Sequence, residues 1–145
     1  MGYIKTESPG APVRAQEPQP LAIHVAFTTE PETVAALRRA AGLASGLNAR
    51  LHLVAPQVVP WAAEIDHPHV SPDFTAAKML KLAAEAGVEA DVHVVLCRDR
   101  IEGLESVLGI NAVVVTGEDK LTRQLAKRGH QVLAADRFSA KKGER

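Results

Sequence analysis

The sequence has almost no cysteine, no excess of charge of either sign and no long hydrophobic run. Cys97 is the only cysteine among 145 residues, so an intramolecular disulfide is excluded. Lys plus Arg and Asp plus Glu number 17 each, and this balance gives no reason to expect binding to nucleic acid or an anionic membrane. Apolar stretches are short and interrupted, which excludes a spanning helix, and the first residues lack the core of a secretory signal. These absences predict a cytoplasmic protein without nucleic-acid or membrane partners.

Proline is concentrated at the start of the chain. Residues 1–20 hold four of the nine prolines and almost no large apolar side chains. Burial cannot offset the entropy lost on ordering such a segment, so we predict a disordered arm. Residues 138–145 form a short basic tail. The remaining residues, 21–137, are enough for one domain with its own core.

Apolar segments typical of buried strands alternate with segments typical of helices. The predicted strands are 21–27, 50–56, 91–97, 111–117 and 130–136, and the predicted helices are 29–48, 71–87, 101–109 and 119–129. Near-continuous apolar strands separated by helices are typical of a parallel sheet covered on both faces. The sequence therefore predicts a three-layer α/β/α fold, in which a ligand would lie at the carboxyl ends of the strands.

Capping residues mark the ends of the two long helices. Thr29 can cap the first helix, where Glu32 completes a capping box, and Asn48 suits the left-handed position at its end. Ser71 and Gly87 have the same roles in the second helix. The predicted buried stripes are Val34, Leu37, Ala41, Ala44 and Leu47 in the first helix and Ala76, Ala77, Leu80, Ala83 and Ala84 in the second.

Three segments of this pattern carry a family likeness. AALRRAAGLASGLNARLHLVAP, VEADVHVVLCRDRIEGLES and NAVVVTG resemble the first helix to second strand, the third strand to third helix, and the fourth strand of the universal stress protein family. The resemblance implies a five-stranded parallel sheet of strand order 3-2-1-4-5, of the adenine nucleotide alpha hydrolase-like type. It also implies a homodimer with a role in the stress response. Many members of this family bind ATP, and others have lost the nucleotide.

The segment after the fourth predicted strand departs from the ATP-binding loop that the resemblance implies, G-x2-G-x9-G-[S/T]. Gly117 fills the first position of that motif, but Lys120 replaces the second glycine and His130 stands where the third is expected. Phe27 replaces the aspartate that the resemblance places beside adenine. The usual ATP loop is therefore missing.

Acidic residues also stand where a phosphate would bind. A phosphate cradle needs free backbone N–H groups at the positive N-terminus of a helix. Asp119, next to Glu118, is expected to cap the last helix with its own carboxylate. A carboxylate ~4–6 Å from a phosphate repels it by about 1–4 kcal/mol. The sequence therefore predicts no cofactor, and ATP is not expected to bind in the usual way.

Three predicted strands each carry a histidine between apolar residues, namely His24, His52 and His93. In the strand order that the resemblance implies these strands are neighbours, so the rings should form a row with about 5 Å between strands. A row of imidazoles is consistent with a metal site or a pH-sensitive ladder. It is also expected of amphipathic rings that fill the interface between sheet and helices, and we favour this structural interpretation.

The loop before the second long helix gathers further candidate groups. Glu64, Asp66, His67 and His69 are potential metal ligands within six positions, although we favour a polar surface loop. Trp61 in the same loop is either a lid over the strand ends or a contact with a partner.

No catalytic constellation accompanies the fold. The segment after the first strand lacks the acidic cluster of a phosphoacceptor receiver and the pyrophosphate loop of a nucleotide alpha-hydrolase enzyme. We therefore predict a non-enzymatic binding or regulatory module with an unknown protein partner. It is expected to form a homodimer through the last strand, an exposed edge that contains Gln131, Val132 and Leu133.

The alternative interpretation is a stress protein that binds a nucleotide or another small ligand at a remodelled site. Thr29, Gly117, Lys120 and Thr122 would form this site at the strand carboxyl ends, with Trp61 as its lid. Titration with adenine nucleotides distinguishes the two interpretations.

Overall fold

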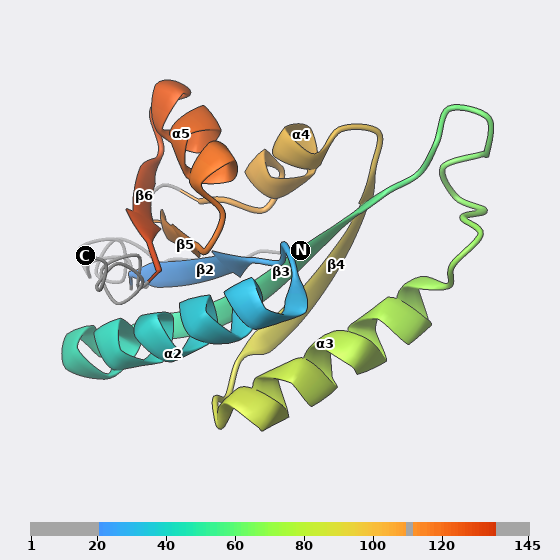
Figure 1. Ribbon diagram of the computed structural model, residues 1–145. Coiled ribbons are helices and arrows are strands. Elements are labelled where there is room, and N and C mark those ends of the chain that lie inside the picture. The colour runs from blue at the N-terminus through green and yellow to red at the C-terminus, as the bar shows by residue number, and fades with distance from the viewer. Residues whose placement is uncertain (1–20, 110–111, 136–145) are drawn as a thin grey trace, which may run out of the picture.

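The computed structural model describes residues 21–109 and 112–135. Strands and helices alternate along this part of the chain, as the sequence predicts (Figure 1). The elements are β2 (Ala22–Ala26), α2 (Glu30–Leu47), β3 (Arg50–Val58), α3 (Pro72–Ala86), β4 (Asp91–Cys97), α4 (Arg100–Glu105), β5 (Ala112–Thr116), α5 (Asp119–Lys127) and β6 (Gln131–Ala134). None of the described helices is long and apolar enough to cross a membrane. The predicted arm and basic tail lie outside the described residues.

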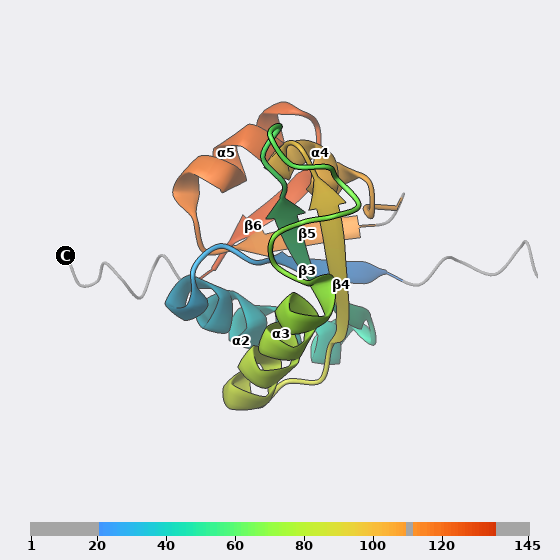
Figure 2. The same cartoon turned by 90° about the vertical axis from the view of Figure 1, so that its right-hand side faces the viewer.

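The five strands pair in parallel in the order β4-β3-β2-β5-β6. Numbered along the chain this order is 3-2-1-4-5, which confirms the order that the family resemblance implies. Helices α2 and α3 cover one face of the sheet, and α4 and α5 cover the other (Figures 1 and 2). The direction of chain progression reverses between β2 and β5, and folds of this class bind ligands outside the strand carboxyl ends at such a point.

The core consists of two apolar layers, one on each face of the sheet. The layer under α2 and α3 includes Ile23, Val25, Leu37, Leu53, Met79 and Val115. The layer under α4 and α5 includes Ala26, Val54, Leu104, Val114, Leu121 and Leu125. Neighbouring residues of one strand, such as Val114 and Val115, enter opposite layers. This burial on both faces explains why the strands read as near-continuous apolar runs.

The two long helices end where the sequence predicts, but their buried faces differ from the prediction. Asn48 and Gly87 adopt left-handed conformations after α2 and α3, with φ of 53° and 74°. The predicted stripes are partly wrong, because Leu47 and Leu80 are each 56% exposed. The residues that are buried are Thr33, Ala36, Leu37, Ala40 and Ala44 in α2 and Met79, Leu82 and Ala83 in α3. Alanine occurs on several faces of both helices, so the apolar pattern identifies the helix without fixing which face is buried.

Candidate functional site

The segments that follow β2 and β5 are in close contact at the point where chain order reverses. Gly117, in the turn after β5, lies against Glu32 in the first turn of α2. A Cβ atom added at Gly117 would lie 2.8 Å from the Glu32 carbonyl oxygen and 2.9 Å from its Cβ. No side chain fits there, so the close approach of two backbone segments requires glycine. The one glycine of the ATP motif that is retained therefore has a packing role.

Backbone amides at the start of α2, which a phosphate would need, are bonded within the chain. The Thr29 hydroxyl accepts from the Glu32 N–H at 3.3 Å and so caps α2, as the sequence predicts. The Thr33 hydroxyl accepts from the Thr28 N–H at 3.0 Å. A ligand that used either amide would have to replace a contact that holds the start of the helix.

Two oxygens in this region have no hydrogen-bond partner. They are Oγ1 of Thr28 and Oε1 of Glu32, and both atoms are buried. A buried polar atom without a partner costs about 1–3 kcal/mol of stability. An ionised carboxylate only accepts hydrogen bonds, so a group with N–H or O–H donors would satisfy Glu32, whereas a fully ionised phosphate would not.

The turn between β5 and α5 differs by one residue from the predicted arrangement. Glu118 is the N-cap of α5, and its side chain makes no capping hydrogen bond. The prediction that Asp119 is this cap is wrong, because Asp119 is already the first helical residue. Two hydroxyls hold the turn instead: Thr116 Oγ1 accepts from the Glu118 N–H at 3.0 Å, and Thr122 Oγ1 donates to the Glu118 carbonyl at 3.0 Å.

The carboxylate of Glu118 pairs with Arg100 at the start of α4. Hydrogen bonds of 3.0 and 2.8 Å join the guanidinium to both carboxylate oxygens, and the two side chains are 32% and 25% exposed. The bonds from Arg100 lower the pKa of Glu118, and the charge of Lys120 contributes less. Glu118 is therefore ionised at neutral pH, and its negative charge is fixed at the N-terminus of α5.

The four residues predicted for ligand binding have different surroundings. Gly117 lies against α2, Lys120 is exposed, and the hydroxyls of Thr29 and Thr122 are used at the starts of α2 and α5. Ligand binding through either hydroxyl would compete with a helix contact. The fold brings the start of α2 next to Gly117. The hydroxyls of Thr29 and Thr122, however, already form hydrogen bonds within the chain.

Arg98, which the sequence analysis did not single out, holds the loop between β3 and α3. Its Nη1 donates to the carbonyl oxygens of Val59, Pro60 and Ala63 at 3.1, 2.6 and 2.9 Å. Its guanidinium also lies 4.6 Å from the ring centroid of Trp61. Trp61 is 81% exposed. The only feature of the sequence that could have indicated this role is the position of Arg98 directly after a predicted strand.

The same loop brings three of its four predicted metal ligands together. His67 Nδ1 lies 2.9 Å from Asp66 Oδ1 and 3.3 Å from Glu64 Oε1. Within residues 21–109 and 112–135 this is the only group of three such side chains whose ligand atoms all lie within 4.8 Å of one another. All three residues are exposed, and His69 is not part of the group.

The three histidines of the strands lie in a row. His24 and His52 are register partners, and their rings are stacked with centroids 4.9 Å apart. His93 is opposite Val54, two positions along, yet its ring centroid is 5.0 Å from that of His52. Burial and the nearby His52 and His93 lower the pKa of His24 to about 4, so the ring is neutral at neutral pH. Nδ1 of His24 is buried without a partner.

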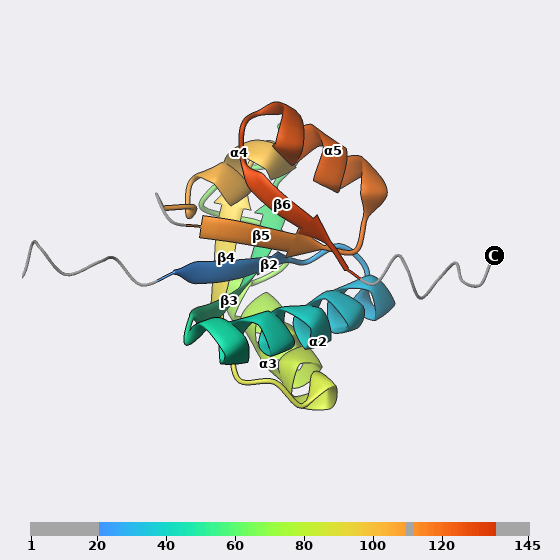
Figure 3. The same cartoon turned by 90° about the vertical axis from the view of Figure 1, so that its left-hand side faces the viewer.

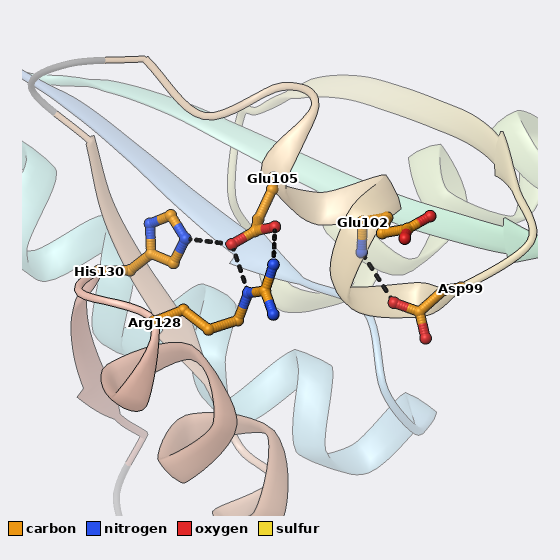
Figure 4. Close-up of polar contacts among 5 residues, drawn as sticks. All are labelled: Asp99, Glu102, Glu105, Arg128 and His130. Atoms are coloured by element: carbon orange, nitrogen blue, oxygen red, sulfur yellow. Dashed lines mark hydrogen bonds and ion pairs between the residues drawn. The ribbon is translucent and has the colours of Figure 1, made fainter.

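A second polar cluster joins α4 to the turn before β6 (Figure 4). Glu105 accepts from Arg128 at 2.7 and 2.8 Å and lies 2.8 Å from Nε2 of His130. The bonds from Arg128 and His130 lower the pKa of Glu105 to about 2. Asp99 caps α4 nearby through the Glu102 N–H at 3.0 Å. His130, which occupies the place of the third motif glycine, thus has a structural partner.

Two grooves lie near the amino ends of β3 and β4, away from the strand carboxyl ends. One of about 560 Å³ is lined by Arg50, Leu80 and Asp91 among others, and one of about 450 Å³ by Ala44 and Asn48 among others. Neither contains a residue that the sequence predicts for ligand binding.

Comparison with known proteins identifies similar structures. No protein-family model matches the chain, and no curated protein matches it. A universal stress protein from Archaeoglobus fulgidus in complex with dAMP superposes with a TM-score of 0.56 and 15% identity over 80% of this chain and 98% of that one. A universal stress protein in complex with cAMP superposes with a TM-score of 0.53 and 17% identity, over 79% of this chain and 95% of that one. The described chain therefore has the fold of the universal stress proteins.

Proposed function

We propose that this chain is a universal stress protein-like module that binds or regulates a protein partner, without catalysis and without binding ATP in the usual way. The ion pair of Glu118 with Arg100 carries this proposal, since a carboxylate is fixed where a helix N-terminus would otherwise favour phosphate. This helix begins at the strand carboxyl ends, beside the point where chain order reverses and where folds of this class hold ligands.

Isothermal titration with ATP tests the proposal. We expect no binding tighter than about 1 mM, which corresponds to roughly −4 kcal/mol. Glu118→Gln removes the carboxylate and leaves Arg100 without its partner, so this variant should bind ATP more tightly than the parent chain. Glu85→Gln, an exposed change on α3, alters the net charge equally and should have no effect. A dissociation constant near micromolar for the unmodified protein would refute the proposal.

The module is proposed to act as a homodimer through β6. This strand forms one edge of the sheet, and no described element lies beyond it (Figure 3). Gln131 is exposed and Leu133 is 37% exposed, whereas Val132 packs in the layer under α4 and α5. The free backbone groups of an edge strand can pair with a second copy across a two-fold axis.

A second candidate function is the binding of a small ligand at the same place. The unpartnered oxygens of Thr28 and Glu32 favour it, and two structures of similar fold are complexes with dAMP and cAMP. Glu32 Oε1 needs a donor, so the ligand would present N–H or O–H groups, such as a ribose hydroxyl or an amine, to this oxygen.

Native mass spectrometry of the purified protein distinguishes the two functions. A small-molecule adduct that is lost in Glu32→Gln would establish the second function. An unliganded mass, together with no shift on addition of AMP or cAMP, is expected under the first.

A further inference from the structure

Within the histidine row, His52 and His93 meet nitrogen to nitrogen, whereas His24 and His52 meet face to face. Nδ1 of His52 lies 2.9 Å from Nε2 of His93, so one ring donates its N–H to the in-plane lone pair of the other. The rings of His24 and His52 are only 19° from parallel, and their lone pairs therefore do not converge. The pair His52 and His93 is thus the part of the row in which two potential ligand nitrogens lie close together and face each other.

Asp91 adds a carboxylate to this pair. It is the register partner of His52 and lies two residues before His93 on β4, so all three side chains leave the same face of the sheet. Asp91 Oδ2 is 3.9 Å from Nδ1 of His52, and the Asp91 side chain is 51% exposed. Arg50 holds that oxygen at 2.7 Å, and the Arg50 side chain is 70% exposed, so both side chains are free to reorient.

We propose that His52, His93 and Asp91 form a binding site for one divalent transition-metal cation of the zinc class. Two Zn–N bonds of ~2.0–2.1 Å at a tetrahedral angle place the nitrogens about 3.3–3.4 Å apart. The observed 2.9 Å has to widen by about 0.4–0.5 Å, and both rings have to turn so that their lone pairs point at a cation beside the N–N line. The ring that donates the hydrogen bond moves its proton to its other nitrogen, so both rings bind as neutral imidazoles. Rotation of Asp91 away from Arg50 supplies the third ligand, and water completes the coordination.

The positions of His52 and His93 in the sheet favour the binding of a cation. Both histidines lie on neighbouring, hydrogen-bonded strands, which fix ligand positions better than a loop does. The register places the side chains of His52, Asp91 and His93 on the same face of the sheet. The loop cluster of Glu64, Asp66 and His67 is the competing location, but its side chains are 75–80% exposed.

Titration of the full, tag-free and metal-free chain with ZnCl₂ tests the proposal. We expect one Zn²⁺ per chain. Asp91→Asn and His93→Gln should each weaken Zn²⁺ binding at least about tenfold. Even the loss of a residue that only hydrogen-bonds a metal ligand lowers metal affinity by about 10–100-fold. Asp91 is exposed, so Asp91→Asn tests the site without removing a packed side chain. His67→Ala is the matched control and should bind as tightly as the parent.

Nuclear magnetic resonance provides a second measurement of the same binding event. Zn²⁺ should shift the ring nitrogens of His52 and His93 and leave those of His67 unchanged. Three outcomes overturn the proposal: no binding by the parent chain, unchanged binding in both Asp91→Asn and His93→Gln, or loss of binding in His67→Ala.

Discussion

Gly117 occupies a confined backbone position, where the turn after β5 touches α2. Gly117→Ala should destabilise the protein by about 1–3 kcal/mol, because its Cβ would overlap the backbone of Glu32, which is part of a helix and cannot rotate away. Gly42→Ala is the matched control, since no atom lies within 4 Å of its added Cβ. In the interior of α2 it should stabilise by up to about 1 kcal/mol. Urea unfolding measures both changes, and an unaltered midpoint in Gly117→Ala would contradict the close contact.

Glu105 connects elements that are distant in the sequence, since it joins α4 to the turn before β6. Its pKa is about 2 in the folded protein and ordinarily 4.5. A lowered carboxylate pKa contributes stability that is complete above the ordinary pKa and is lost as the pH falls through the folded value. The contribution of Glu105 should therefore disappear between about pH 4.5 and pH 2. This contribution to stability comes from the hydrogen bonds that Arg128 and His130 donate to the ionised carboxylate of Glu105.

The variant Glu105→Gln tests this acid dependence. Its thermal midpoint should be lower than that of the parent at pH 6, and it should fall less between about pH 5 and pH 2.5, because the titrating group is gone. Glu102→Gln removes one carboxylate from the same helix and is the charge-matched control. Parallel profiles for the parent and Glu105→Gln would show that the cluster does not link the two elements energetically.

Arg98 connects β4 to the loop that follows β3. Arg98→Met keeps the aliphatic stem but removes the bonds to three loop carbonyls and the stacking on Trp61. We expect faster proteolysis within 59–70 and lower fluorescence anisotropy of Trp61, the only tryptophan, with little change in global stability because the loop is exposed. Arg38→Met, an exposed change on α2, is the control. Equal proteolysis of both variants would show that Arg98 does not hold the loop.

The elements themselves are predictable from sequence because their signals act over a few residues. Strand runs, the Thr29 cap and the left-handed end at Asn48 are all confirmed. The site is less predictable, because its contacts depend on how elements pack. Arg98 reaches carbonyls 35 to 39 residues earlier, and Gly117 touches a helix near the start of the domain. Neither neighbour is marked by any local pattern.

At the scale of the whole molecule, β4 and β6 form the two edges of the sheet, and we expect β6 to pair with a second copy. A lysine on an edge strand is a common means of preventing such pairing. Leu133→Lys should therefore convert a dimer of twice 15.5 kDa to a monomer of 15.5 kDa in multi-angle light scattering. Val58→Lys is the control, because Val58 is 50% exposed at the end of β3, beside the other edge. A dimer that survives Leu133→Lys but dissociates in Val58→Lys would place the contact at the β4 edge, beside Trp61.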